Sequence, residues 1–297
     1  MSDNSKNSVK SKNNKKFRGA IINWRRVQER LFNISVFAVF ALMGLMVWRF
    51  SRSNIRINVE PEVVAAFNVP YESIGILQAF AENNNISFAE LFAVFNAENN
   101  FFPHQHATYD LSNLDSLSLS DFRQSKRRYN VTSLIPYVSM YINLFYEIEV
   151  FPVPLDSSII FNNTWGVEHN LQGKPRHMGI AIIDRTNTRG RVPVVSMTGG
   201  TIQQAGWDTN LGYFVRIVTE NNTNYVYAHL DSLAQEVVAG HIIEAGFPLG
   251  QMGNSGGAQR SFPVHLHLAI SPQADFTRDV FWINPYPLLK HLASVGN

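Results

Sequence analysis

Histidine is the residue type in this chain that points most clearly to chemistry. Two histidines stand two residues apart in VHLHLAI, as His265 and His267. Alternate residues of a β-strand point to the same face, so the two imidazoles project together while Val264, Leu266 and Leu268 point to the opposite, apolar side. Paired imidazoles on one face suit metal binding, in which one ring ligates the metal and the other transfers protons. A pair of half-exposed surface histidines is the alternative for this pattern taken alone.

Two further histidines lie in segments that predict β-strands. His177 opens HMGIAII, where Gly179 and the apolar run after it predict entry into a buried strand. His229 lies near the end of NYVYAHL, an alternating strand, and we expect its ring to lie near the edge of the sheet. The chain order is therefore His-x-Gly, then Tyr-x-His-Leu, then His-x-His.

This order of motifs resembles that of the lysostaphin/LytM-type zinc metallopeptidases, a family of peptidoglycan endopeptidases. Similar segments surround the histidines: TWG at 164–166, PVVSMTGG at 193–200, VVAGHIIEAGFPLGQMGNSG at 237–256, FPVHLHLAI and INPYPLLKHL. The resemblance covers about 155–292, roughly half of the chain. It is especially evident for the membrane-anchored members found in Gram-positive spore-forming bacteria.

The resemblance implies a role for each of the four histidines. In that family the zinc ligands are the first histidine, an aspartate four residues later and the last histidine of His-x-His. His177 and His267 match the two histidine ligands. His229 and His265 match the two catalytic histidines that do not bind the metal but orient or deprotonate water and stabilise the oxyanion. The aspartate position is occupied by Ala181.

Ala181 weakens the expectation of a catalytic zinc site. Such zinc ions have three protein ligands and an open position for water. A methyl group in place of an anionic ligand removes charge compensation and one anchor. We therefore expect zinc to be bound weakly or not at all, with an affinity loss well above the roughly 10–100-fold typical of lost outer-shell contacts. A weak or alternative metal site and a groove lined by hydrogen-bonded histidines are both open.

Three nearby side chains are candidates to replace the missing carboxylate. Asp184 lies three residues after Ala181, and odd spacing puts it on the opposite face of a regular strand, so only a bulge or turn could aim it at a metal. Glu168 and His169 precede His177 and could reach over from a loop. Surface positions are the interpretation we favour for these groups.

The elements that position the histidines predict an all-β domain. Short apolar or alternating runs recur from about residue 155: GIAII, VPVVSM, GYFVRIV, NYVYAHL and VHLHLAI. Turn-forming clusters separate them, namely TGG at 198–200, ENNTN at 220–224 and GNSGG at 253–257. This pattern predicts a mainly β domain over residues 155–292, and the resemblance implies an antiparallel β-sheet core. We expect NPYPLLKHL to close the domain as a short helix or turn.

A small α-helical juxtamembrane module is predicted over residues 71–150. Apolar residues at helical spacing indicate helices over 71–82, 88–97, 120–128 and 134–147. Ser87 and Glu90 form a capping box before the second of these.

Two polar features of this module have alternative interpretations. Lys126, Arg127 and Arg128 form a basic cluster that is most simply a solvated helix end, with anionic wall polymers or lipid as alternative contacts. Glu98 follows a segment that loosely resembles the helix carrying the catalytic glutamate of lytic transglycosylases, although a surface glutamate is the interpretation we favour.

The N-terminal fifty residues predict a membrane anchor. Residues 1–30 hold nine Lys or Arg residues and two acidic ones, and their polar opening lacks the apolar side chains needed to fold. Residues 31–48 contain no charge, and eighteen residues of helix span about 27 Å, enough for the hydrocarbon layer. We expect a basic disordered tail over 1–30, a transmembrane helix over 31–50 and a tether over 51–70.

The charge distribution around this segment predicts its orientation. Because positive residues stay on the cytoplasmic side, we expect a single-pass protein of the cell membrane with a cytoplasmic N-terminus and an extracytoplasmic C-terminal domain. A signal peptide would have a shorter apolar core and a small-residue cleavage site, and a buried core helix is seldom so uniformly apolar.

Composition excludes several function classes. A net charge of +2 gives no general argument for nucleic-acid binding, and the absence of cysteine excludes disulfides, thiol catalysis and cysteine-based zinc sites. The residues and the resemblance together predict a membrane-anchored peptidoglycan metalloendopeptidase homologue with impaired or absent catalysis. We expect it to bind a wall peptide or an envelope protein partner in cell-wall remodelling or sporulation. An active zinc endopeptidase that cleaves peptidoglycan stems or cross-bridges is the alternative.

Overall fold

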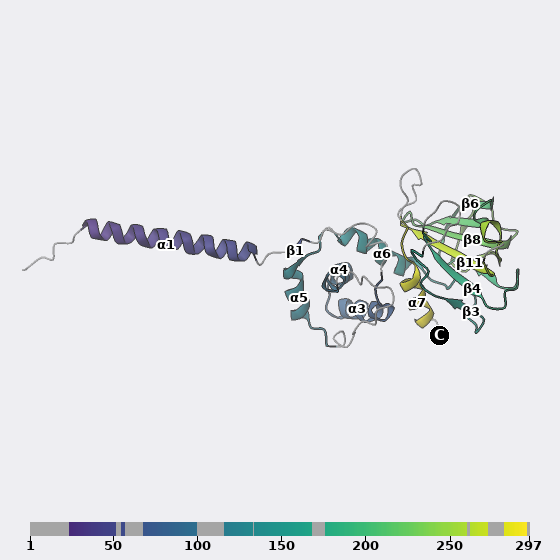
Figure 1. The fold of residues 1–297 in the computed structure, drawn as a ribbon, viewed down its shortest axis with the longest axis horizontal. Helices are drawn as coiled ribbons and strands as arrows, with labels where there is room; N and C mark the ends of the chain where they lie inside the picture. Colours follow the sequence, from purple (N-terminus) through teal and green to yellow (C-terminus); the bar gives the residue numbers. More distant parts are fainter. Residues whose placement is uncertain are drawn as a thin grey trace, which may run out of the picture. The chain divides into compact units, whose positions relative to one another are not determined.

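The computed structural model describes residues 24–51, 55–56, 68–99, 116–132, 134–167, 176–259, 262–272 and 282–295 (Figure 1). The chain divides into two compact units, Met1–Arg52 and Ser53–Asn297. Most of the predicted tail and most of the predicted tether lie outside the described residues.

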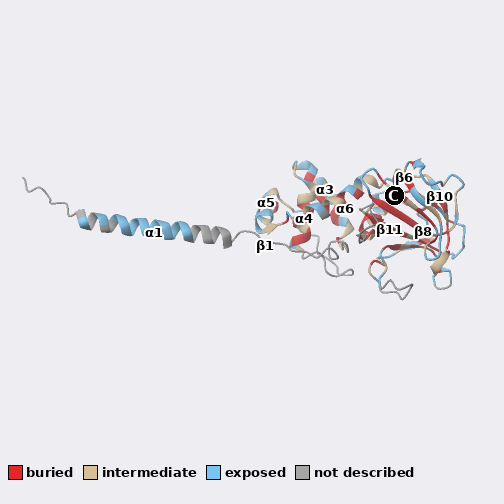
Figure 2. Ribbon diagram, turned by 90° about the horizontal axis from the view of Figure 1, so that it is seen from above, coloured by how far each residue is buried: buried red, intermediate tan, exposed pale blue. Residues whose placement is uncertain are grey.

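The first unit contains one long helix, α1 (Trp24–Ser51). It begins seven residues before the predicted membrane segment at residue 31. The large apolar side chains described between Leu31 and Met43 are exposed, as Figure 2 shows. Among the described residues, no helix combines the length and the apolar character needed to cross a membrane.

The second unit begins with a group of short helices. They are α3 (Tyr71–Asn83), α4 (Phe88–Glu98), α5 (Leu119–Arg128) and α6 (Ile135–Glu147). All four match the predicted helices to within two residues. The capping side chain of Ser87 accepts the N–H of Glu90 at 3.3 Å, which fixes the start of α4. Apolar side chains such as Ile74, Leu77 and Phe92 are fully buried between these helices.

A short parallel pair of strands lies beside α5. β1 (Ile55–Arg56) pairs with β2 (Tyr129–Asn130), and β2 follows α5 without a gap. The chain that enters the second unit is therefore joined by backbone hydrogen bonds to the end of α5.

The rest of the second unit is a nine-stranded sheet in the described part of the chain. Its strands are β3 (Ile159–Phe161), β4 (Ile180–Asp184), β5 (Pro193–Val195), β6 (Gly200–Asp208), β7 (Gly212–Val218), β8 (Asn224–Leu233), β9 (Ile242–Ile243), β10 (Pro248–Met252) and β11 (His265–Ser271). The order is β3-β4-β11-β8-β7-β6-β9, with β10 pairing β5 and β8, and every pair is antiparallel. The predicted antiparallel β core is confirmed, and α7 (Tyr286–Val295) closes it as a helix.

The sheet has two unlike faces because its strands alternate. One face, here called the core face, carries Tyr225, Tyr227, Leu266 and Leu268, all fully buried in the main apolar core. The other, here called the histidine face, carries a small cluster of Phe214, Val226, Ala228 and Ala269. His267 lies on this second face, because it is directly opposite Ala228 in the β11–β8 ladder. Figure 2 shows the deep burial of β11.

β6 was not predicted from the sequence. It is nine residues long, but Ile202 is its only buried side chain, and its pairing with β7 shifts register between Ile202 and Gln204. A strand with one core contact shows no apolar period of two, so only its TGG turn was recognisable.

The helices are attached to the sheet by the last residue of α6. The Glu147 carboxylate accepts four side-chain hydrogen bonds from the turn between β7 and β8 and from the start of β8. The donors are Thr219, Asn221, Thr223 and Tyr225.

A second attachment joins α6 to the chain just before α7. The hydroxyl of Tyr141 donates to the carbonyl of Asn284 at 3.2 Å and accepts its N–H at 3.0 Å. Asn284 follows Ile283, which bridges Ile270 near the end of β11, whereas His265 and His267 lie at the start of that strand. The described attachments of the helices are therefore at the strand ends away from the histidines.

Candidate functional site

The four predicted histidines lie together at one end of the histidine face. Nε2 of His177 is 2.8 Å from Nδ1 of His267. The ring of His229 has its centre 5.0 Å from that of His265 and 5.8 Å from that of His267. They come from the segment before β4, from β8 and from β11, so the fold assembles residues up to 90 positions apart.

His177 is held by the TWG segment. Its N–H donates to the carbonyl of Val167 at 2.9 Å, and its own carbonyl accepts the N–H of Gly166 at 2.8 Å. Its Nδ1 is 3.0 Å from the carbonyl of Thr164, which can only accept, so Nδ1 carries the proton. In the neutral ring Nε2 is then an acceptor, and His267 donates to it through Nδ1.

Gly179 permits this close approach of the two rings. A Cβ at this position would lie 2.7 Å from Cε1 of His267 and 2.6 Å from the carbonyl oxygen of Leu268. The glycine of His-x-Gly is therefore required by space beside His267.

His229 faces the site because β8 is irregular there. Regular alternation would put it on the core face with Tyr225 and Tyr227. Its backbone instead has φ 62°, in a stretch where the β7–β8 register shifts, and the next residue, Leu230, returns to the core. The predicted position at the strand end and sheet edge is wrong: β8 continues to Leu233 and lies between β11 and β7.

Ser255, in the GNSGG turn, holds this irregular segment in place. Its carbonyl accepts from Nδ1 of His229 at 2.9 Å. Its hydroxyl accepts the N–H of Tyr213 at 3.0 Å and donates to the carbonyl of Leu230 at 2.5 Å. The composition of GNSGG predicts a turn, but nothing in its pattern indicates this positioning contact.

The two histidines assigned to catalysis are held neutral by burial. Burial, together with a smaller effect of the nearby ring of His229, lowers the pKa of His265 to about 4. Burial also lowers the pKa of His229. Nδ1 of His265 lies 2.8 Å from the carbonyl of Pro263, so both rings donate through Nδ1 and keep Nε2 as an acceptor. Such rings can accept a proton or a hydrogen bond from a ligand in the groove.

Ala181 lies where a third metal ligand would be needed. It is directly opposite His267 in the β4–β11 ladder and therefore projects from the same face. Its N–H donates to the hydroxyl of Thr164 at 3.2 Å. An alanine at this position supplies no donor atom to the site.

The described residues do not fit a catalytic zinc ion. Two nitrogens bound to one tetrahedral zinc at about 2.0–2.1 Å would be roughly 3.3–3.4 Å apart, whereas those of His177 and His267 are 2.8 Å apart and hydrogen-bonded. No group of three or more His, Cys, Asp or Glu residues in the described part of the chain could hold a metal. Glu168 and His169 lie outside the described residues.

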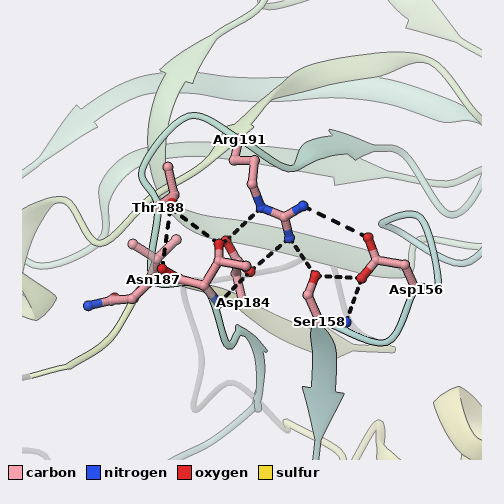
Figure 3. Close-up of polar contacts among 8 residues, drawn as sticks. Asp156, Ser158, Asp184, Asn187, Thr188 and Arg191 are labelled. Carbon is pink, nitrogen blue, oxygen red and sulfur yellow. Dashed lines mark hydrogen bonds and ion pairs between the residues drawn. The ribbon is translucent and has the colours of Figure 1, made fainter.

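Asp184 is not available as a replacement ligand. It is fully buried on the core side of β4, the face that the odd spacing predicts, so the favoured interpretation of Asp184 as a surface group is wrong. Arg191 donates to both its oxygens, at 2.8 and 3.1 Å, and Thr186 donates to them as well (Figure 3). The hydrogen bonds from Arg191 hold the pKa of this carboxyl well below its ordinary value. Asp184 is thus a structural anion that ties the end of β4 to the loop after it.

Glu98 and the basic cluster of α5 lie away from this site. Glu98 is the exposed last residue of α4 and accepts a hydrogen bond from Ser125. Because its side chain is exposed, the interpretation of Glu98 as a surface glutamate is retained.

Comparison with known proteins agrees with this geometry. Residues 175–278 match peptidase family M23. The L-Ala–D-Glu endopeptidase of Bacillus subtilis (strain 168) is 31% identical over 144 residues, which are 47% of this chain and 42% of that protein. Endolysin 2638A of Staphylococcus phage 2638A is 32% identical over 88 residues, which are 30% of this chain and 18% of the endolysin. The chain thus spans less than half the length of these curated relatives.

A solved structure shows a wider likeness. The crystal structure of a candidate glycyl-glycine endopeptidase LytM from Ruminococcus gnavus ATCC 29149 is 29% identical, with a TM-score of 0.59. The match covers 78% of this chain and 90% of that one, so it extends beyond the β-rich domain into the helices. Residues 175–278 are therefore a domain of peptidase family M23, homologous to the LytM/lysostaphin-type peptidoglycan endopeptidases.

Proposed function

We propose that this protein is a membrane-anchored, extracytoplasmic M23 homologue in which catalysis is impaired or absent and the histidine groove binds a ligand. The observation that carries this proposal is the site itself. Two ligand positions hold His177 and His267, the third holds Ala181, and the one described carboxylate on the same strand is bound by Arg191.

The ligand that the site favours is a peptide of the cell wall. A relative is named for cleavage of an L-Ala–D-Glu bond, and the groove keeps all four histidines that line the site in this family. The rings of His229 and His265, held neutral by burial and bonded through Nδ1, can accept hydrogen bonds from peptide N–H groups through Nε2. A segment of an envelope protein would offer the same groups, which makes it the alternative ligand. A role in cell-wall remodelling or sporulation rests on the resemblance to anchored members of the family.

The anchor is proposed from the N-terminal sequence. The uncharged run over 31–48 follows nine basic residues, and α1 holds this run in helical form. A helix inserted in a bilayer would place its large apolar side chains in lipid. We propose insertion over 31–50 with the N-terminus in the cytoplasm.

Metal content and turnover test the proposal. The full chain is purified in detergent, its zinc is measured per molecule, and digestion of peptidoglycan is assayed with and without added Zn²⁺. We expect less than stoichiometric zinc, no released muropeptides, and retained binding of wall peptide. Stoichiometric zinc with digestion that is lost in His267→Ala would overturn the proposal.

Ala181→Asp provides a gain-of-function arm. Because Ala181 is the ladder partner of His267, the new carboxylate would project beside the metal-binding nitrogens. We expect zinc affinity to rise by more than about 100-fold. Ile183→Asp is the matched control, since it lies on the same strand and face but opposite His265. Equal zinc binding by both variants would mean that position 181 is not the missing ligand.

Active zinc endopeptidase is the second candidate function. It is favoured by the presence of histidine at both histidine-ligand positions, His177 and His267. In that case His177→Ala would abolish both zinc binding and muropeptide release, whereas the binding function would lose peptide affinity alone.

A further inference from the structure

The outward face of α5 is a cluster of arginines with no catalytic role. Phe122 is buried and marks the inner face of this helix. Arg123, Arg127 and Arg128 are exposed. At 100° per residue these three lie about 100–240° around the helix from Phe122, so they share the solvent side. This set is called the arginine face below.

The described acidic groups nearby are engaged elsewhere. Glu90 pairs with Lys126 at 2.6 Å, and Asp121 accepts from the capping hydroxyl of Ser118 at 2.6 Å. Glu98 accepts from Ser125. In the described part of the chain no carboxylate forms an ion pair with the arginine face.

Helix stability explains only part of this arrangement. Cations in the last turn interact favourably with the helix dipole, which accounts for Arg127 and Arg128. Arg128 also lies 5.4 Å above the ring of Tyr129. Arg123 lies in the middle of the helix, where the dipole gives no such gain. An anionic surface that contacts all three residues accounts for the whole face.

Chain connectivity brings this face within reach of a bilayer. β1 pairs with β2, which follows directly on Arg128. Ile55 is only seven residues after Trp48, the last residue of the uncharged run, and seven residues span at most about 25 Å. If 31–50 crosses the membrane, as proposed above, the tether keeps the end of α5 near the headgroups.

We propose that the arginine face binds the phosphate groups of anionic lipids in the membrane that holds the N-terminal helix; this inference rests on the proposed anchor. Guanidinium groups bind phosphate oxygens in a bidentate manner. Each basic residue near an anionic surface strengthens association about fivefold, so three give about 100-fold. The attraction acts within about 8 Å at physiological salt, which is why the short tether matters.

The test uses the full chain in vesicles with single fluorescent labels. The protein has no cysteine, so one introduced cysteine is labelled uniquely. Gln124→Cys reports on the arginine face, Phe40→Cys reports on insertion of the anchor, and Gln203→Cys on β6 is the remote control. Quenching by lipids with headgroup or acyl-chain nitroxides is compared between phosphatidylcholine vesicles and vesicles with added phosphatidylglycerol.

We expect the Phe40 label to be quenched by acyl-chain nitroxides in both lipids. The Gln124 label should be quenched by headgroup nitroxides only with phosphatidylglycerol, and raised salt should reverse this. Arg127→Gln should lower the ratio of docked to undocked protein about fivefold, and Arg185→Gln, which removes one exposed charge elsewhere, should leave this ratio unchanged. The label at Gln203 should stay unquenched.

Two results would overturn the inference in distinguishable ways. Absence of quenching at Phe40 refutes the anchor, and the lipid contact with it. Quenching at Phe40 together with a Gln124 signal that is absent, or equal in neutral and anionic lipid, refutes the arginine contact and leaves the anchor standing.

Discussion

The attachment of α6 to the sheet gives a sharp prediction at Glu147. Its carboxylate accepts hydrogen bonds from Asn221 at 2.7 Å, Thr219 at 3.2 Å, and Thr223 and Tyr225 at 3.3 Å. Hydrogen bonds to charged groups contribute about 1.5–3 kcal/mol each at good geometry. Three of the four are long and the carboxylate is only half-buried, so the sum is well below four times that figure.

We expect Glu147→Ala to lower the free energy of unfolding by about 2–4 kcal/mol. Much of this loss comes from the fully buried hydroxyl of Tyr225, which loses its acceptor. Glu147→Gln should cost about 1 kcal/mol, because the amide oxygen still accepts while the charge is lost. Glu149→Ala is the matched control: it removes an exposed glutamate two residues on.

Urea and thermal unfolding of residues 53–297, followed by circular dichroism, measure this loss. For a chain of this size each kcal/mol shifts Tm by about 2–4 °C. If Glu147 couples the helices to the sheet, Glu147→Ala should also separate one transition into two. A Glu147→Ala protein as stable as Glu149→Ala, with a single transition, would refute the reasoning.

Three further predictions concern the sheet. Asp184→Asn should cost about 1.5–3 kcal/mol at neutral pH, because the buried side chain loses its charge-assisted hydrogen bonds from Arg191; urea unfolding measures it. The pKa of Asp184 is lower in the folded protein than in the unfolded chain, so its stabilising effect is complete above the unfolded pKa of about 3.9 and is lost as pH falls below it. The variant should therefore lose less stability than the native protein on acidification. Equal losses of unfolding free energy below about pH 4 in both proteins would contradict this. Gly179→Ala should displace the His267 ring and lower peptide affinity at least tenfold in calorimetric titration, and unchanged affinity would mean that the ring is not part of the binding surface. Ser255→Ala should retain the fold but shift the nitrogen resonances of the His229 ring, and an unshifted spectrum would show that the carbonyl alone positions the ring.

The period of two along a strand was enough to place part of this site. It predicts that His265 and His267 share a face and that Leu266 and Leu268 enter the core, as observed. The same parity argument places Asp184 on the side away from Ala181. These inferences need only local backbone geometry, which apolar alternation reports directly.

The rest of the site depends on contacts that no local pattern encodes. His229 reaches the histidine face only because one residue adopts a positive φ, and that conformation is maintained by Leu211 and Ser255 from other segments. Likewise the partner of Asp184 is Arg191, seven residues on across a turn. A sequence read as regular strands cannot foresee a bulge that tertiary contacts impose.

The direct hydrogen bond between His177 and His267 explains how the histidine site can keep its arrangement although Ala181 replaces the carboxylate ligand. His177 and His267 are both partly buried, so their ring nitrogens still need hydrogen-bond partners when no metal is bound. Here the fixed tautomer of His177, set by Thr164, leaves one acceptor that meets the Nδ1–H of His267. To bind a metal through that nitrogen, His267 would have to move its proton to Nε2 and the pair would have to separate. The hydrogen bond therefore holds the two rings together without a metal, and this supports a binding role that survives the replacement at Ala181.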